Sequence, residues 1–265
     1  MKKKILSIIA FLVIGFIIYS YFSQPKEEYY TDYTGDLTVV PEDGKIPNRV
    51  TLPQAWDDNT RKAFWYTSQG ADIMPYDWFT YLEQPNTTKL FRNAEFLEAL
   101  GYIPQKASIE NPSGLPIGFA ITRFRKNTPR GFGLNCAACH TNQLNYNGAN
   151  ILIEGAPSVA NFVKLLSQLI KSLDNTYKND AKFNRFAKNV LKDYSSAKAN
   201  ALRKELEKVA IATSERQLVN TLPKDYPKDF TSYGRIDAFG NIMNAGTAFA
   251  LNDLSNKNFP DAPVS

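Results

Sequence analysis

The stretch that decides how this chain is interpreted is Asn135-Cys136-Ala137-Ala138-Cys139-His140-Thr141, which holds both cysteines and the one histidine of the 265 residues. The spacing C-x-x-C-H is typical of c-type haem attachment. Two thiols two residues apart lie on one side of a helical turn and add to the two vinyl groups of one haem, and the next imidazole ligates the iron. We therefore predict one covalently attached haem c, held by Cys136 and Cys139, with His140 as the proximal iron ligand.

Other interpretations of the cysteine pair have less support. A thioredoxin-like pair belongs at a strand-to-helix junction in a βαβ unit, which the surrounding pattern does not show. A zinc site needs further Cys or His ligands, and the chain has none left. A disulfide between residues so close in sequence closes too small a loop to stabilise the fold much. Covalent haem remains the favoured interpretation.

The sixth ligand of such an iron stays open in the sequence. A second histidine is excluded, and the internal methionines are Met74 and Met243. Met74 precedes Pro75 in a loop-like stretch, whereas Met243 falls in an expected helix, where methionine usually fills a core. Methionine ligation would give an electron carrier with a raised potential, and an open position would leave the iron free for O2 or peroxide. The sequence favours the open position.

The N-terminus predicts where the chain is located. Lys2, Lys3 and Lys4 precede an apolar run over residues 5–22, and about 17–25 such residues span a bilayer. No small-x-small cleavage site follows the run. We expect residues 1–22 to be a single-pass anchor in the bacterial inner membrane with the lysines in the cytoplasm, and the haem domain to lie in the periplasm. A cleaved signal peptide, leaving a periplasmic or secreted protein, is the alternative.

Composition narrows the class of the remaining chain. Hydrophobic residues make up 43 % and charged residues 22 %, as in a protein with a folded core. Apart from the three N-terminal lysines, the basic residues nearly balance the 26 acidic ones, and no basic stripe suggests nucleic acid as a partner. Residues 23–50 are rich in Pro, Glu, Asp and Tyr and are predicted to be a tether. Residues 51–265 are then the cytochrome c-like haem domain.

Helical patterns dominate that domain. Caps and apolar spacing predict helices over residues 57–70, 76–83, 93–101, 162–173, 183–194, 202–209 and 235–251. Prolines and glycines between Gly101 and Gly133 predict a long ordered loop, and residues 151–155 a short strand or an extended contact. The predicted fold class is mainly α: a c-type cytochrome domain with long ordered loops and little sheet, behind an N-terminal membrane anchor helix.

Several stretches resemble the rubber-oxygenase-like branch of the dihaem cytochrome c peroxidase superfamily. They run from Met74 to Phe79, Leu82 to Pro85, Leu90 to Arg92, Leu100 to Pro104, Asn111 to Phe119, Asn135 to Thr141, Ile153 to Pro157 and Gly234 to Ile242. The haem motif alone is common to many cytochromes, and the ordered set around it is much more specific.

The resemblance implies a mostly helical, exported cytochrome. The haem at the positions of Cys136, Cys139 and His140 would be the site of O2 or peroxide chemistry, and a second haem would pass electrons to it. Family members are typically about twice as long and carry a second C-x-x-C-H motif, whereas this sequence carries one. It is therefore either the N-terminal haem half of a dihaem protein or a single-haem descendant. A periplasmic redox partner or a chain bearing the second haem is expected.

A few other side chains each have two interpretations. In the matching stretch, Arg235 lies either near a haem propionate, where a bidentate contact is strong, or in a pair with Asp237 that fixes the start of a helix. Trp78 is either a core anchor or a contact to the haem edge. Phe239 and Phe249 are a helix-spaced pair that faces the distal side of the haem or the core, and the core is favoured.

The sequence thus predicts a haem-binding c-type cytochrome with redox or electron-transfer activity. One version is a haem-dependent oxidoreductase, peroxidase- or oxygenase-like, that acts at an open iron. Another is a membrane-tethered electron carrier, not an enzyme, with methionine as the sixth ligand. A third is a truncated haem-binding half of a dihaem oxygenase or peroxidase. One histidine fits all three, so the ligand count does not separate them.

Overall fold

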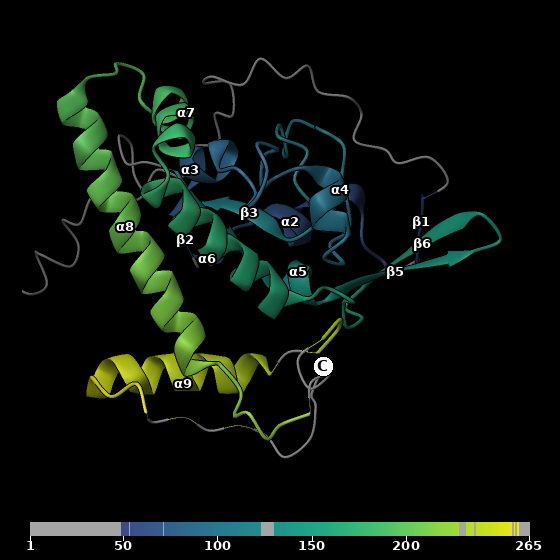
Figure 1. Ribbon diagram of the computed structural model, residues 1–265. Helices are drawn as coiled ribbons and strands as arrows, with labels where there is room; N and C mark the ends of the chain where they lie inside the picture. The colour runs from purple at the N-terminus through teal and green to yellow at the C-terminus, as the bar shows by residue number, and fades with distance from the viewer. Residues whose placement is uncertain are drawn as a thin grey trace, which may run out of the picture. The chain divides into compact units, whose positions relative to one another are not determined.

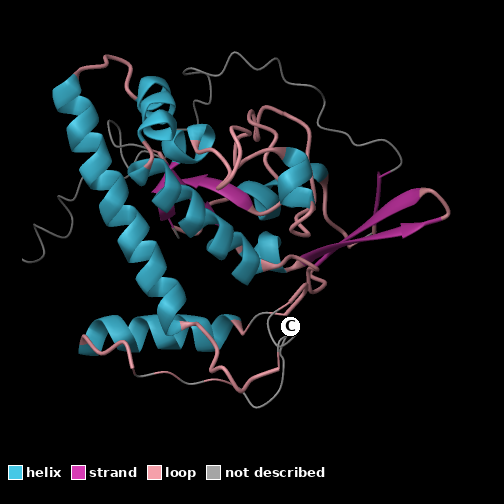
Figure 2. Cartoon of the chain, in the orientation of Figure 1, coloured by secondary structure: helices cyan, strands magenta, loops and turns pink. Residues whose placement is uncertain are grey.

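The computed structural model of the chain describes residues 49–52, 54–70, 72–122, 130–227, 232–235, 237–255, 257 and 259. Of this part, 46 % is helix and 15 % is strand, and the strands form two separate sheets (Figures 1 and 2). The prediction of a mainly α fold with little sheet is therefore wrong, and the domain is mixed α/β.

Each sheet has three strands. One has the order β2-β4-β3 and is antiparallel, with β2 (Asp72–Pro75), β3 (Phe119–Thr122) and β4 (Gly131–Leu134). The other has the order β1-β6-β5, with β1 (Arg49–Thr51), β5 (Thr141–Tyr146) and β6 (Ala149–Glu154). In this second sheet β5 and β6 form an antiparallel hairpin, and β1 pairs in parallel with β6.

The sequence pattern does not predict most of these strands, for a physical reason. Strands β3 and β4 lie in or beside the Pro- and Gly-rich stretch that predicted a long loop, and β4 itself reads Gly131-Phe132-Gly133-Leu134. Strand β5 is built largely of Asn, Gln and Thr, so it lacks the alternation of apolar and polar residues that signals a strand. The short strand expected over residues 151–155 is confirmed as part of β6.

All seven predicted helices are present, but their bounds differ: the helix expected over residues 202–209 runs over 196–219, and the one expected over 183–194 runs over 180–190. They are α2 (Asp58–Tyr66), α3 (Tyr76–Tyr81), α4 (Ala94–Glu98), α6 (Phe162–Lys178), α7 (Asp180–Val190), α8 (Ser196–Val219) and α9 (Ala238–Leu251), with a single-turn helix α5 (Cys136–Cys139) at the cysteine pair. The side chains of Asp57, Asn93, Asn135, Asn161, Asn179, Ser195 and Asp237 cap the N-termini of α2 and α4 to α9. Such caps satisfy backbone N–H groups that have no partner within a helix.

The main core joins α6, α7 and α8 to the sheet β2-β4-β3. Leucines and phenylalanines at helical spacing, such as Leu169 and Phe186, are 1 % exposed. The ring of Phe79 in α3 stacks on that of Phe132 in β4, with the ring centroids 3.6 Å apart. A smaller apolar cluster contains Ile103, Ile117, Ala137 and Leu152. It places α5 on its own small core.

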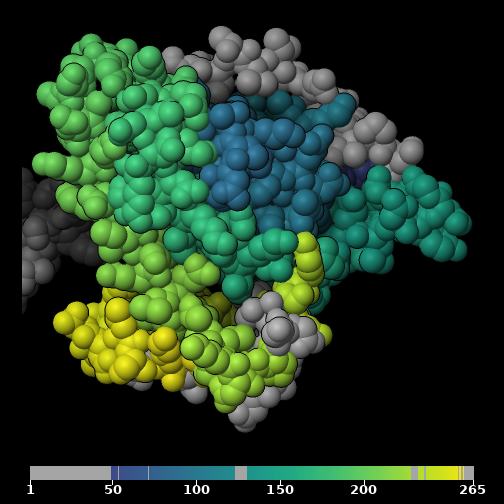
Figure 3. Space-filling view, viewed as in Figure 1, coloured from purple at the N-terminus to yellow at the C-terminus, as the bar shows by residue number. Residues whose placement is uncertain are grey.

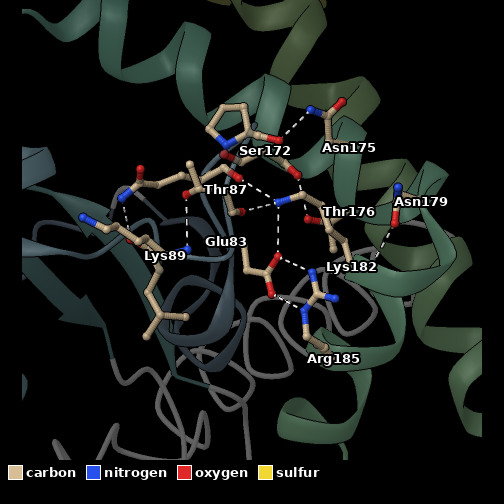
Figure 4. Close-up of polar contacts among 12 residues, drawn as sticks. Glu83, Thr87, Lys89, Ser172, Asn175, Thr176, Asn179, Lys182 and Arg185 are labelled. Carbon is tan, nitrogen blue, oxygen red and sulfur yellow. Dashed lines mark hydrogen bonds and ion pairs between the residues drawn. The ribbon is translucent and has the colours of Figure 1, made fainter.

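A buried carboxylate ties the segment after α3 to α7 (Figure 4). Glu83 accepts hydrogen bonds from Arg185 Nε at 2.6 Å and Arg185 Nη2 at 2.8 Å, and from Lys182 Nζ at 3.1 Å. Lys182 Nζ also donates to the carbonyl oxygens of Gln84 and Thr87. Burial alone would raise the pKa of Glu83, but these hydrogen bonds outweigh it and lower the pKa below its ordinary value of 4.5. Glu83 is therefore charged and fully paired at neutral pH.

The N-terminal predictions fall mostly outside this part of the chain. The expected anchor, residues 1–22, and the tether up to residue 48 lie outside the described residues. The last two residues of the expected tether, Arg49 and Val50, belong to β1. Within the described ranges, no helix is both long and apolar enough to cross a bilayer.

Candidate functional site

The cysteine pair lies on a helical turn that Asn135 holds by hydrogen bonds to α2 and to the turn itself. In α5, Asn135 accepts a hydrogen bond from the N–H of Ala137 at 3.0 Å. The side-chain Nδ2 of Asn135 donates to the carbonyl oxygens of Phe64, Trp65 and Thr67 at 2.9–3.2 Å, and these bonds join the turn to the end of α2. Asn135 therefore begins the turn and anchors it at once.

The inner side of the turn is closely packed. Ala137 and Ala138 are 1 % and 4 % exposed. Gly118 has φ +83°, and a Cβ built on it would lie 2.0 Å from the backbone nitrogen of Ala138. Only glycine fits there, because any side chain would collide with backbone that has no room to move.

The outer side of the turn carries the two thiols and the imidazole. Cys136 and His140 are exposed and Cys139 is half-buried. Residues i and i+3 of a helical turn lie on the same face, so the two free thiols point to the same side. The N–H of His140 donates to the Cys136 carbonyl at 2.8 Å, which continues the turn through the histidine. The motif thus presents two thiols and one imidazole outward from a fixed base.

The surroundings of the thiols are polar on one side and aromatic on the other. Gln69 Oε1 lies 3.2 Å from both the nitrogen and the Sγ of Cys136. Burial raises the pKa of the Cys139 thiol, and Cys136 adds to the shift. Burial also raises the pKa of Tyr102 well above its usual value, with a further contribution from Cys139. Cys139 is therefore a neutral thiol at neutral pH.

The fold also bears on the alternatives for the cysteine pair. Strand β4 does precede α5, but it is antiparallel to its neighbours, and β5 after α5 belongs to the other sheet. No βαβ unit surrounds the motif, so a thioredoxin-like setting is absent from this part of the structure. Among the described residues, no group of three or more His, Cys, Asp or Glu side chains is placed to hold a metal ion.

A segment that we call the strap, residues 155–161, closes the end of the turn. The N–H of Gly155 donates to the His140 carbonyl at 2.7 Å, and the N–H of Ser158 to the Cys139 carbonyl at 2.9 Å. Gly234 donates to the carbonyl of Ala160 at 3.2 Å. A Cβ on Gly234, where φ is +69°, would lie 3.0 Å from the Ser158 carbonyl oxygen. The strap therefore connects the C-x-x-C-H motif with the segment that leads into α9.

An ion pair that sequence reasoning missed braces the strap. Arg61 of α2 and Glu154 at the end of β6 pair at 2.5 Å, with side chains 7 % and 0 % exposed. Nearby, Arg49 donates to Gln143 Oε1 at 2.9 Å, and burial lowers the pKa of Arg49 to about 10. Glu154 directly precedes the strap. Its position in the stretch from Ile153 to Pro157, one of those that carry the resemblance, was the one feature of the sequence that pointed to it. The pair is buried, so it positions the site and does not face a substrate.

Helix α9 has an apolar face without cover from the described residues. Phe239, Ile242, Met243 and Phe249 are 86 %, 70 %, 62 % and 48 % exposed. The opposite face contacts α8, and Ala248 is fully buried. The expectation that Phe239 and Phe249 fill the core does not match these exposures. Gly234, which is bonded to the strap, precedes Ala238, the first residue of α9, by four positions in the chain.

The structure separates the remaining candidates. Met74 is 3 % exposed within the main core, whereas Met243 lies on the open face of α9. Arg235 is half-buried beside Gly234, directly after the segment bonded to the strap. Asp237 accepts from the N–H of Gly240 at 2.8 Å and thus begins α9. Trp78 is 9 % exposed and packs edge-on against Phe186, as a core anchor does.

Comparison with known proteins adds a relative but no function. Protein y4iJ of Sinorhizobium fredii, which is itself uncharacterized, is 30 % identical over 248 residues; the match covers 85 % of this chain and 40 % of that protein. The chain thus spans about two fifths of the relative's length. No protein-family description matches the chain. No solved structure matches it either.

Proposed function

We propose that this chain is a haem-binding c-type cytochrome, with one haem c attached through Cys136 and Cys139 and ligated by His140. The outward presentation of two thiols and one imidazole from a turn with a buried, glycine-fitted base carries the proposal. The residues fit the group, because both thiols are free and share a side of the turn. A bound haem would supply reversible one-electron chemistry at its iron.

Each residue of the site then has a role of its own. Asn135 and Gly118 hold the turn so that the sulfur atoms and the imidazole keep one orientation. The strap fixes the carbonyls of Cys139 and His140. The apolar face of α9, starting at Phe239, would exclude water from the side on which a hydrophobic macrocycle lies. Burial of that face against a cofactor also accounts for large apolar side chains being left uncovered by the described protein.

The wider setting belongs to the same proposal. The resemblance and the N-terminal sequence support an exported domain, anchored in the bacterial inner membrane, that exchanges electrons with a periplasmic partner or with a chain bearing a second haem. The relative, more than twice as long as its matched region, is compatible with a further domain in proteins of this type. Peroxidase- or oxygenase-like activity at an open iron is the enzymatic form of the proposal.

A second candidate is an electron carrier with Met243 as the sixth ligand. One observation favours it over ligation by Met74: the Met243 side chain is exposed on α9, while Met74 is packed in the core. Met74 would have to leave its packing to reach the haem iron, and its departure would leave a cavity in the core.

Carbon monoxide binding separates the two forms. The chain, matured in a host that attaches c-type haem, is reduced and its spectrum recorded with and without the gas, together with Met243→Leu and the control Met74→Leu. A prompt shift in the unaltered chain supports an open iron. A spectrum that ignores the gas, and that responds only in Met243→Leu, supports the carrier. A purified chain with no haem band would contradict both.

A further inference from the structure

The hairpin of β5 and β6 has an open edge. In the order β1-β6-β5, strand β5 pairs on one side with β6 and has no strand on its other side within the described ranges. Figure 3 shows this hairpin, residues 141–154 in teal, standing out at one side of the described domain. An edge of this kind presents backbone N–H and C=O groups that can pair with another strand.

The backbone groups that face outward can be assigned. The N–H of Gly155 donates to the carbonyl of His140, so that pair is hydrogen-bonded and every second residue of β5 from it bonds to β6. The backbone groups of Gln143 and Asn145 therefore point to the open edge. Thr141, also of this set, is 1 % exposed and closed to a partner. The usable edge runs from Gln143 to Tyr146.

One face beside this edge is apolar and exposed. Leu144 and Tyr146 are 51 % and 67 % exposed. Leu144 lies opposite Ile151, and Val50 lies opposite the same residue from the other side, so the three share a face. Val50 is 49 % exposed. The edge therefore offers an apolar contact together with its hydrogen bonds.

The edge also lacks the usual protection. Natural edge strands avoid pairing by means of lysines, prolines or bulges. Strand β5 reads Thr-Asn-Gln-Leu-Asn-Tyr without a charge or a proline, and its register with β6 is regular throughout. Within residues 141–154 the one charged residue is Glu154, which is buried in its pair with Arg61. Strand β5 therefore carries no charge of its own that would repel a second copy, and the Arg49 guanidinium beside it is held by Gln143 Oε1 at 2.9 Å.

We propose that two copies of this chain pair in antiparallel fashion through the outer edges of β5, with the two-fold axis at Leu144. In this register Gln143 of one copy lies opposite Asn145 of the other, and each such pair exchanges both of its backbone hydrogen bonds. Leu144 faces its own counterpart, in the closer type of cross-strand pair. The strand is self-complementary here, which singles out a second copy as the occupant.

One local bond must give way when the edges join. The N–H of Gln143 is held at 2.7 Å by Oδ1 of Asn142. That bond competes with the second copy for a donor that the new sheet needs. Substitution Asn142→Ala removes the competitor, so the proposal expects it to leave the association as strong or stronger.

The test is sedimentation of the full chain in mild detergent over a range of concentrations. Leu144→Lys places like charges opposite each other and should weaken the dimer about tenfold or more. Leu218→Lys is the matched control, because Leu218 is 50 % exposed on α8, away from the hairpin. Asn145→Pro removes an outward N–H, keeps the backbone hydrogen bonds to β6 and loses only a 3.5 Å side-chain bond to Asn150, and it should weaken the dimer as well. The N-terminal segment is the same in every variant, so its contribution cancels.

Cross-linking fixes the register. Under mild oxidation, Leu144→Cys should yield a disulfide between two copies at residue 144, mapped by mass spectrometry, and Leu218→Cys should yield at least several-fold less. A chain that stays monomeric at its highest soluble concentration would overturn the proposal. So would equal loss of association in both lysine variants, or no excess cross-link at residue 144. None of these results depends on haem, so the proposal fails or stands apart from the cytochrome function.

Discussion

Helices α5 and α9 differ in how the protein surrounds them, although the strap is bonded both to α5 and to Gly234, which precedes α9. The single turn α5 is held on its inner side by Gly118, Asn135 and a small apolar core, and it leaves only its reactive side chains outside. Helix α9 is much longer, yet it exposes its most apolar face. The difference indicates that the described domain completes the base of the site and leaves its cover to something else, for which a haem is our proposal.

The largest expected effect concerns the base. Gly118→Ala should lower the free energy of unfolding by about 3 kcal/mol, because overpacking costs about 1–3 kcal/mol and a positive φ about 1 kcal/mol more. Gly155→Ala is the matched control, since Gly155 has φ +89° but no heavy atom near its added Cβ. It should cost only about 1 kcal/mol. Urea denaturation measures both, and equal losses would show that α5 is not fitted onto Gly118.

The buried carboxylate Glu83, which is paired with two residues of α7, can be compared with an exposed ion pair on α8. Glu83→Gln removes the charge shared by Lys182 and Arg185 and should cost about 3 kcal/mol at neutral pH, because Lys182, with a side chain 13 % exposed, keeps only carbonyl partners and loses its counter-charge. Glu205→Gln removes an exposed pair with Lys208 and should cost about 0.5 kcal/mol or less. Equal costs in the two variants would mean that the buried network does not hold α7 to the segment after α3.

The same carboxylate sets a pH dependence. The pKa of Glu83 is lowered in the folded chain, so its contribution to stability is complete above its ordinary value of 4.5 and is lost as the pH falls through the lower folded pKa. The unfolding free energy of the unaltered chain should therefore fall more steeply in acid than that of Glu83→Gln. Parallel curves from pH 6 downward would contradict the lowered pKa.

The smallest effect is expected on the open face of α9. Phe239→Ser with Ile242→Ser should change the stability of the haem-free chain by about 0.5 kcal/mol or less, since both side chains are largely exposed. In the haem-loaded chain the same change should lower the midpoint of thermal unfolding clearly. Ala248→Leu, on the buried face, should destabilise both forms. An equal effect of the double serine variant on both forms would remove α9 from the cover of the site.

The sequence foretold the helices better than the sheets. Capping residues such as Asp57 and Asn93 mark helix starts locally, so those positions could be predicted from the sequence. Strands β4 and β5 could not, because their short Gly-rich and Asn-rich stretches become strands only through pairing with partners elsewhere in the chain. Secondary structure set by long-range contacts leaves little local pattern.

The site shows the same limit. The two cysteines and the histidine were visible in one short motif, but the pairing of Arg61 with Glu154 joins residues far apart in sequence, and no local pattern predicts that these two side chains meet. Met74 looked like a loop residue because it precedes a proline, and the structure places it in β2 within the core. Phe239 looked like a core residue, and the structure exposes it. Spacing shows which residues share a helix face, but not what covers that face.

The most direct test of the central claim is covalent haem attachment. The full chain is expressed in a host with the c-type maturation machinery, extracted with acid and acetone, and weighed intact by mass spectrometry beside Cys136→Ala with Cys139→Ala. We predict that the unaltered chain keeps the mass of one haem and that the double variant keeps none. An unaltered chain without haem, or a double variant that retains it in full, would contradict the account.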